Sequence, residues 1–207
     1  MGETTGRNDR PLFGVIELLS TGQGLPFAGR RSLGRALGEN NSDAVIREAL
    51  DPARFREAMS RVGAAVHIVT TDGPAGLGGI TASAVTSVTV EPPMMLFCIN
   101  KGSRCAAKVL QNGVFCINTL GRADQRLSDV FAGRTGHEQE ERFAETEWRV
   151  LATGAPVLPS ALVAFDCRLV ESKEFGTHLV MIGEVEAVEI APRADALMYA
   201  HREYWRL

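Results

Sequence analysis

The sequence lacks any apolar run long enough to cross a membrane. No stretch of its 207 residues approaches the roughly 20 consecutive apolar residues that a membrane-spanning helix needs. Its first apolar patch, PLFGVIELL, contains the acidic Glu17 and does not have the layout of a signal peptide. We therefore expect a cytoplasmic protein that has no membrane partner.

The sequence also lacks an excess of positive charge. With 22 Lys and Arg against 25 Asp and Glu, the formal net charge is -3 and the pI is about 5.9. This balance gives no broad attraction for nucleic acid, although it is compatible with a local basic pocket. A content of 45% hydrophobic and 23% charged residues is typical of one globular domain with a sizeable core. The expected partners are small molecules or other proteins.

Cysteine is scarce, and its spacing matches neither a metal site nor a redox motif. The four cysteines, Cys98, Cys105, Cys116 and Cys167, form no CxxC pair and have no zinc-ligand spacing. Two of them lie in the apolar runs MLFCIN and VFCIN. We predict buried, reduced thiols rather than disulfides, and no metal site.

Familiar catalytic and nucleotide-binding signatures are missing. The run Gly76 to Thr81 approaches the dinucleotide fingerprint GxGxxG, but Thr81 replaces the last glycine and a strand-like segment follows. No Gly-Lys-Ser/Thr follows as in a P-loop, and no GxSxG elbow is present. His137-Glu138 begins like a zinc-protease helix, but Glu141 stands where the second histidine belongs. Rossmann, P-loop and hydrolase interpretations therefore have little support.

Residues 1 to about 50 differ in composition from the rest of the chain. They hold eight of the 21 glycines, mixed with arginines and polar residues. Such a segment buries little apolar surface, so we expect a flexible N-terminal extension. An arm that binds a partner or embraces a second subunit is the alternative.

The folded domain is expected to span residues 51–207 and to begin with a short helix. Asp51 is a suitable N-cap, and Pro52 suits the first helical position. In the segment ARFREAMSRV that follows, Phe55, Met59 and Val62 lie on one face. The segment is therefore predicted to be an amphipathic helix.

Strands dominate the remaining pattern. AAVHIVTT, ITASAVTSVT and MMLFCIN are predicted strands, separated by the turn DGPAGLGG and by Pro92-Pro93. Ser103 can cap a helix through about Leu110, GVFCINTL returns as a strand, and a charged helical region is expected over 124–145. Two long β segments, ALVAFDCRLVESKEF and THLVMIGEVEAVEI, follow around a turn at Gly176. This order favours a mainly β fold, a closed or split antiparallel barrel with a few peripheral helices.

The predicted strand after the glycine-rich turn has an unusual supply of small hydroxyl side chains. Alternation along a strand places Thr81, Ser83 and Val85 on one face, with Ala82, Ala84 and Thr86 on the other. Small side chains let a flat ligand approach the backbone, whose polar groups can bond the edge of a heteroaromatic ring. The alternative is a Thr/Ser-rich strand packed against a neighbouring strand.

Two further segments are candidate parts of a ligand site. Asn100 to Arg104 ends a strand and starts a helix, and free N–H groups beside Lys101 and Arg104 could bind a phosphate. Solvated charges beside a helix cap are the alternative. His178 follows the Gly176 turn and enters a strand. A lone histidine is more often a surface or satisfied-core residue, so its place beside the turn only keeps a site role open.

Together these segments resemble the flavin reductase family of FMN-binding split barrels, especially the reductase components of hydroxyphenylacetate hydroxylase and of pyrimidine utilisation. The resemblance covers about Phe55 to Leu207. It is carried, in order, by FREAMSRVGAAVHIVTTDGPAG, GITASAVTSVTVEPPMMLFCIN, FAGRTGHEQEERF, FGTHLVMIGEV and YAHREYWRL.

The resemblance implies positions for the cofactors. His178 would lie by the nicotinamide and position it. The flavin-contacting residues implied are Gly79, Ile80, Thr81, Ala82, Ser83, Ala84, Cys98, Ile99 and Asn100 around the ring, Ser103, Arg104 and Cys105 at the phosphate, and Tyr199, Arg202 and Tyr204 near the pocket. Two departures stand out: the N-terminal extension, and Arg104-Cys105 where many relatives have small hydroxyl residues.

The activity that the resemblance implies is hydride transfer from NADH or NADPH to FMN or FAD. The reduced flavin would pass to a partner monooxygenase, and the protein would be a homodimer with its flavin site near the subunit interface. One alternative is reduction of cobalamin, ferric iron or a xenobiotic through bound flavin. Another is a flavin- or haem-binding split barrel without turnover.

Overall fold

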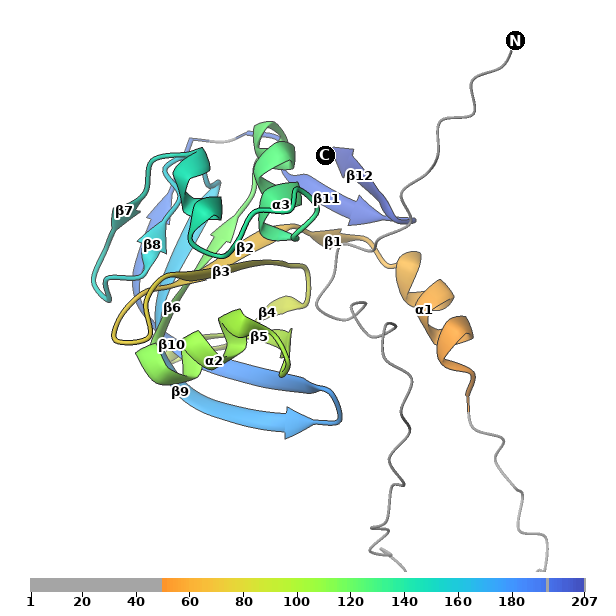
Figure 1. Ribbon diagram of the computed structural model, residues 1–207, viewed down its shortest axis with the longest axis horizontal. Coiled ribbons are helices and arrows are strands. Elements are labelled where there is room, and N and C mark those ends of the chain that lie inside the picture. The colour runs from red at the N-terminus through yellow and green to blue at the C-terminus, as the bar shows by residue number, and fades with distance from the viewer. Residues whose placement is uncertain (1–49, 193, 207) are drawn as a thin grey trace, which may run out of the picture.

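The computed structural model describes residues 50–192 and 194–206, and Figure 1 shows their arrangement. The extension expected over residues 1–50 lies outside these ranges, apart from Leu50. The described helices, including two 3-10 turns, are α1 (Pro52–Ser60), α2 (Arg104–Asn112), η1 (Arg122–Asp124), α3 (Gln125–Phe131) and η2 (Glu141–Glu145). The described strands are β1 (Ala64–Ala65), β2 (His67–Thr71), β3 (Gly78–Ala82), β4 (Val85–Val90), β5 (Pro93–Asn100), β6 (Val114–Thr119), β7 (Arg149–Val150), β8 (Pro156–Val157), β9 (Val163–Phe175), β10 (His178–Ile190), β11 (Leu197–Ala200) and β12 (Glu203–Arg206).

Seven strands form one antiparallel sheet in the order β3-β2-β6-β9-β10-β5-β4. Its two edge strands, β3 and β4, are consecutive in the sequence, and only Ser83 and Ala84 separate them. The Ala84 carbonyl accepts a hydrogen bond of 2.9 Å from the Cys98 N–H on β5. The expected single strand ITASAVTSVT is therefore wrong: the chain leaves one edge of the sheet at Ala82 and joins the other at Val85. This crossing is the seam of a split antiparallel barrel, the fold class that the sequence predicts.

The two longest strands fit the prediction closely. β9 and β10 form an antiparallel hairpin of 13 residues a side, joined at Gly176, whose φ of 59° lies in the left-handed region that favours glycine. A smaller sheet, β1-β11-β12, brings the C-terminal hairpin against the start of the barrel. The sequence reasoning did not assign strands to this C-terminal segment.

The charged region expected as a helix over 124–145 is broken. α3 ends at Phe131, and η2 begins only at Glu141. Gly133 (φ 75°) and Gly136 (φ 79°) adopt left-handed conformations between them, which end the helix and turn the chain. In Figure 1, α3 lies above β3 and α2 lies below it.

The core is apolar and aromatic. One cluster packs Phe97 edge-on against Phe115, with ring centroids 4.9 Å apart. A second cluster, under α3, packs Phe131 against Phe143 and Trp148. Cys105, Cys116 and Cys167 are buried and Cys98 is half-buried, and all four thiols are free, as predicted.

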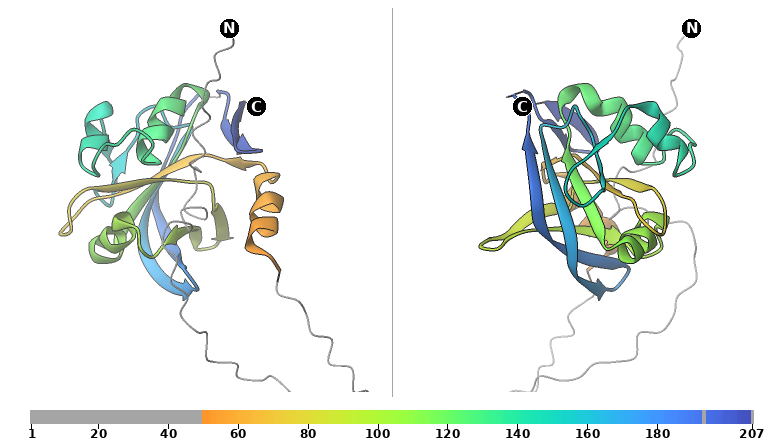
Figure 2. Two further views of the ribbon diagram at one scale, coloured as in Figure 1. Left: turned by 45° about the vertical axis from the view of Figure 1, so that its right-hand side comes forward. Right: turned by 90° about the vertical axis from the view of Figure 1, so that its left-hand side faces the viewer.

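Helix α1 begins as expected but packs differently from an ordinary amphipathic helix. The Asp51 side chain accepts a 2.9 Å hydrogen bond from the Ala53 N–H, which caps the helix. None of its nine residues is buried. Figure 2 shows α1 standing beside the barrel, apart from the sheet. Within the described ranges, no helix has the length and apolar character needed to span a membrane.

Candidate functional site

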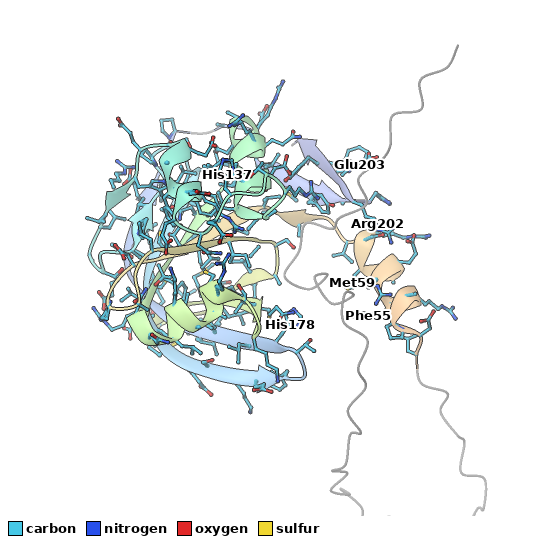
Figure 3. All side chains as sticks on the ribbon, in the orientation of Figure 1. Phe55, Met59, His137, His178, Arg202 and Glu203 are labelled. Atoms are coloured by element: carbon cyan, nitrogen blue, oxygen red, sulfur yellow. The ribbon has the colours of Figure 1, made fainter. Side chains whose placement is uncertain are left out.

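A cleft of about 420 Å³ lies between α1 and the seam of the barrel. Its lining combines apolar side chains with a few hydroxyls, one histidine and two arginines. Those residues are Pro52, Phe55, Arg56, Met59, Ser60, Val62, Ala64, Ser83, Ala84, Thr177, His178, Tyr199 and Arg202. Figure 3 shows Phe55 and Met59 on α1 with His178 across from them. An apolar cleft with a few convergent polar groups is the usual form of a small-molecule site.

The hydroxyl-rich segment contributes less to the cleft than its sequence predicts. Ser83 and Ala84 line the cleft, whereas Thr81 is only 1% exposed and its hydroxyl donates to the Ser128 carbonyl over 2.7 Å. Gly79 and Ala82 are also buried, and Ile80 packs against the core. The expectation that Thr81 presents its hydroxyl to a ligand is not met, because α3 covers this edge strand. The exposed ledge is reduced to the two residues at the seam.

The seam strand β5 brings a second predicted segment to the same face. Cys98 and Asn100 are half-buried while Ile99, between them, is 1% exposed and lies in the core. On β10, His178 stands directly opposite Asn100 and Val180 opposite Cys98. Residues directly opposite one another share a face of the sheet. Cys98, Asn100 and His178 therefore lie on one face, and Ile99 points away from it.

His178 is held at the mouth of the hairpin. Its Nδ1 lies 2.9 Å from the Thr177 hydroxyl, and the Thr177 carbonyl accepts a 3.0 Å hydrogen bond from the Lys101 N–H. The Asn100 side chain accepts a 2.8 Å hydrogen bond from the Gly102 N–H, which tightens the turn before α2. These contacts fix the histidine beside the turn that the sequence predicts to bind phosphate.

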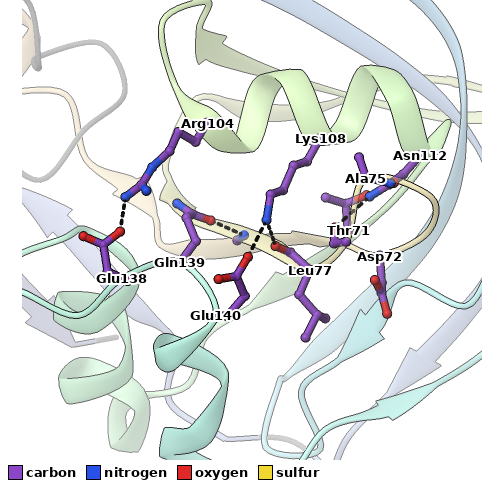
Figure 4. A network of polar contacts seen from close by, with 12 residues as sticks. Thr71, Asp72, Ala75, Leu77, Arg104, Lys108, Asn112, Glu138, Gln139 and Glu140 are labelled. Atoms are coloured by element: carbon purple, nitrogen blue, oxygen red, sulfur yellow. Dashed lines mark hydrogen bonds and ion pairs between the residues drawn. The ribbon is translucent and has the colours of Figure 1, made fainter.

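The cations at the start of α2 are paired with carboxylates (Figure 4). Arg104 contacts Glu138 at 2.6 Å and Lys108 contacts Glu140 at 2.9 Å. Lys101, in the turn before the helix, contacts Glu174 at 2.5 Å. The predicted positive turn is therefore largely neutralised in this conformation. Because Arg104 and Glu138 are both mostly exposed, the pair itself contributes little stability. An anionic ligand at this turn would compete with Glu138 for Arg104.

The start of α2 is otherwise formed as expected. The Ser103 side chain accepts a 3.2 Å hydrogen bond from the Cys105 N–H and caps the helix. Cys105 itself is fully buried, and burial raises the pKa of its thiol to about 12. Its side chain belongs to the core and is not presented to a ligand.

The C-terminal hairpin places two of its three predicted residues in the cleft. Tyr199 and Arg202 line it, and Arg202 has a left-handed φ of 65° and contacts Glu57 of α1 at 3.1 Å. Tyr204 lies behind Tyr199, and the two rings pack edge-on with centroids 5.4 Å apart. Burial raises the pKa of the Tyr204 hydroxyl.

Tyr204 instead joins a polar junction on α3. Its hydroxyl lies 2.9 Å from both the Ser128 hydroxyl and the Asp129 carboxylate. Asp129 also accepts a 2.9 Å hydrogen bond from Arg134, and the Ser128 carbonyl receives the Thr81 hydroxyl. The junction links the ledge strand to the hairpin that forms one wall of the cleft. No spacing in the sequence indicates these long-range contacts.

A metal centre is not formed by the described side chains. Among residues 50–192 and 194–206, no group of three or more His, Cys, Asp or Glu side chains could hold a metal ion.

Comparison with protein families matches residues 59–207 to the flavin reductase-like domain. The chain belongs to this family. The FMN reductase (NADH) RutF of Ancylobacter novellus is 50% identical over 168 residues, which cover 81% of this chain and 92% of the relative. RutF of Variovorax paradoxus is 48% identical over 155 residues, covering 75% of this chain and 85% of the relative.

Solved structures of flavin reductases have the same fold. A crystal structure from Haemophilus somnus described as that of a flavin reductase is 40% identical, with a TM-score of 0.73, and covers 76% of this chain and all of that one. BorF, the flavin reductase component of a bacterial two-component tryptophan halogenase, is 28% identical with a TM-score of 0.71. It matches 76% of this chain and 98% of its own. These flavin reductases therefore share the split-barrel fold of this chain.

The match to the flavin reductase family begins inside α1. Its first residue, Met59, is the penultimate residue of this helix, so Phe55 and Arg56 precede the matched region. Both were missed as site residues. The apolar face of the predicted helix was a usable signal for Phe55, but not for Arg56. Thr177, next to His178, was missed as well.

Proposed function

We propose that the protein is an NADH-dependent flavin reductase that passes a hydride from NADH to FMN or FAD. The observation that carries the proposal is the cleft in which Ser83 and Ala84, at the seam, lie with Thr177 and His178. Among the described residues that line it, none carries a carboxylate or a thiol. Such a lining suits a reaction in which the cofactors supply the reactivity. Relatives about 50% identical are named FMN reductase (NADH), which supports the same activity here.

The residues at the seam fit a planar ring. Ser83 and Ala84 lie outside both strand ladders and carry small side chains, so a ring can approach their backbone closely. Cys98 and Asn100 continue the same face on β5. When bound, the flavin accepts the hydride; the protein contributes orientation and exclusion of water. We assign ring binding to Ser83, Ala84, Cys98 and Asn100.

The phosphate of the flavin is assigned to the turn before α2. The N–H groups at the start of the helix favour an anion, and Ser103 and Arg104 stand beside them. Because Glu138 holds Arg104 at 2.6 Å, phosphate binding on this assignment exchanges one carboxylate for another anion. This exchange limits the net gain from the charge of Arg104.

His178 is assigned to the nicotinamide. Its place in the cleft, with Nδ1 near the Thr177 hydroxyl, suits a residue that orients a carboxamide and need not transfer a proton. Tyr199 and Arg202 form the neighbouring wall.

We further propose a homodimer that delivers reduced flavin to a partner monooxygenase. The face of β5 and β10 beyond the site carries half-buried apolar side chains, including Leu96, Val180 and Ile182, which a second subunit could cover. BorF serves a two-component halogenase, which supports delivery of flavin to a separate enzyme.

One set of assays tests the proposal. Oxidation of NADH and of NADPH is followed with catalytic amounts of protein and with FMN, FAD or no flavin, and then with ferric iron or cobalamin as acceptor. We expect sustained oxidation of NADH that depends on added FMN or FAD. Faster turnover of ferric iron or cobalamin than of free flavin would favour reduction of another acceptor. A single stoichiometric oxidation, or none, would instead indicate a flavin- or haem-binding protein.

A further inference from the structure

Helix α1 carries an apolar face that the rest of the described chain covers only in part. Phe55 is 50% exposed, Met59 43% and Val62, just after the helix, 56%. All three line the cleft, and no residue of α1 is buried elsewhere. The helix therefore has one apolar side, and that side faces the cleft (Figure 3). Burial of this side by a ligand would stabilise both the ligand and the helix.

The contacts that hold α1 lie toward its C-terminal end. Glu57 contacts Arg202 at 3.1 Å, and the Ser60 carbonyl accepts a 2.5 Å hydrogen bond from the His201 N–H. Both partners belong to the turn between β11 and β12. Phe55, one turn nearer the N-terminus, projects over the cleft from a helix fixed mainly at its other end.

The chemistry of the cleft indicates the class of ligand that it suits. The apolar side chains of α1 form one wall, and Thr177 and His178 belong to the residues opposite. Arg56 and Arg202 add two guanidinium groups to the lining, and no carboxylate lies in it among the described residues. Arg202 is already paired with Glu57, outside the lining, so Arg56 is the better candidate for a phosphate contact. This combination suits a flat ring attached to phosphate. Of the residues assigned to the flavin, Ser83 and Ala84 line this cleft, whereas Ser103 and Arg104 at the predicted phosphate turn do not. The α1 wall therefore adjoins the flavin ring position and not the flavin phosphate.

We infer that α1 forms the outer wall of the nicotinamide site, with Phe55 and Met59 packing on the dinucleotide and Arg56 facing its phosphates. The inference rests on the proposed reductase function and extends it to Phe55, Arg56 and Met59 of α1. Phe55 is then a positioning residue for the nicotinamide, and α1 helps to exclude water from the cleft. A second copy of the chain on the same face is the competing occupant.

Equilibrium binding tests the inference without turnover. Phe55→Ala and Met59→Ala are compared with Leu110→Ala, which shortens an apolar side chain 45% exposed on α2 and outside the cleft. NAD⁺ affinity is measured by calorimetry, FMN affinity by flavin fluorescence and oligomeric state by light scattering. We expect Phe55→Ala to weaken NAD⁺ binding about tenfold, because a buried aromatic contact is lost, with FMN affinity within about twofold of wild type. Phe55→Leu should recover part of the loss, and Leu110→Ala should change neither affinity.

Other outcomes overturn the inference. Wild-type NAD⁺ affinity in both Phe55→Ala and Met59→Ala excludes an α1 wall. A change of oligomeric state in these variants, with NAD⁺ affinity unchanged, assigns the face to a second copy. Equal loss of NAD⁺ and FMN affinity indicates a general distortion of the site and also excludes a specific wall. Flavin-dependent NADH oxidation is measured separately, on the same preparation of wild-type protein. Its absence would overturn the reductase function itself, whatever the variants show about the α1 wall.

Discussion

His178 and Asn100 stand directly opposite each other on neighbouring strands, β10 and β5. The pairing brings the turn of the long hairpin against the turn that starts α2, and a hydrogen bond of 3.0 Å from the Lys101 N–H to the Thr177 carbonyl ties the two turns together. The candidate nicotinamide contact and the candidate phosphate turn are therefore parts of one rigid ladder. Substitution of the His178 side chain should affect nicotinamide binding selectively, because the backbone hydrogen bonds between β5 and β10 do not depend on it.

The side chain of His178 should matter for the nicotinamide far more than for the flavin. We expect His178→Ala to raise the KM for NADH about tenfold, the effect of losing one good polar contact, while FMN affinity changes less than about twofold. Steady-state kinetics and flavin fluorescence measure the two quantities. His137→Ala is the matched control, because His137 lies outside the cleft, 3.5 Å from Glu145. Equal losses for NADH and FMN would contradict a positioning role.

Gly79 cannot accept a side chain without displacement of the core. An added Cβ would lie 2.4 Å from a ring carbon of Phe131. We expect Gly79→Ala to lower the free energy of unfolding by about 2 kcal/mol, as overpacking does. Urea unfolding measures this, with Gly63→Ala as the control because its Cβ would meet only the Ala200 Cβ at 4.0 Å. Phe131→Leu in the same chain should offset part of the Gly79→Ala loss; a Gly79→Ala protein as stable as wild type would show that α3 moves freely.

Buried His67 should make the protein sensitive to mild acid. Burial lowers the pKa of His67 from 6.5 to about 4, and its Nδ1 lies 3.1 Å from the Thr119 hydroxyl. Between these values the unfolded chain binds a proton that the folded chain does not, so stability is lost as pH falls below 6.5. We expect the free energy of unfolding to fall by about 2 kcal/mol from pH 7.5 to 5 on account of this residue.

The contribution of His67 can be separated from that of the carboxylates. His67→Gln should reduce the pH dependence of urea unfolding between pH 7.5 and 5, whatever its effect on stability at neutral pH. An identical pH dependence in wild type and variant would mean that His67 becomes protonated in the folded state.

Cys98 should be the one thiol among the four that reacts in the native protein. Burial raises the thiol pKa of all four cysteines, but Cys105, Cys116 and Cys167 are buried, whereas Cys98 is half-buried at the candidate flavin face and can be reached by a reagent. We expect a maleimide to add once to the native protein and four times after denaturation, and FMN to slow the first addition. Mass spectrometry counts the additions. Rapid labelling of a second thiol, or no protection by FMN, would contradict the assignment of Cys98.

Much of this architecture could be predicted from the sequence because its signals are local. The cap at Asp51, the glycine turn at Gly176 and the free cysteines each depend on a few neighbouring residues, and the structure confirms them. The family resemblance, carried by several long motifs, identified the split barrel.

What could not be predicted depends on contacts between distant segments. The sequence predicts that the Thr81 hydroxyl can reach a ligand, but in the fold this hydroxyl donates a hydrogen bond to the carbonyl of Ser128, far along the chain. Arg104 looks like a free cation, but Glu138 pairs with it. The break at Ser83 and Ala84 follows from closure of the barrel. Neither glycine nor proline marks it, and the Thr and Val residues on both sides favour strand. Propensity alone cannot locate such a seam.

The most direct test of the reductase function is anaerobic reduction of free flavin. Excess NADH and FMN are mixed with a catalytic amount of purified protein, and the absorbance of oxidised flavin is followed over time. We predict that many equivalents of FMN are bleached for each protein chain, at a rate proportional to protein concentration. Bleaching that stops at one equivalent of FMN, or that proceeds no faster than in the absence of protein, would contradict the account.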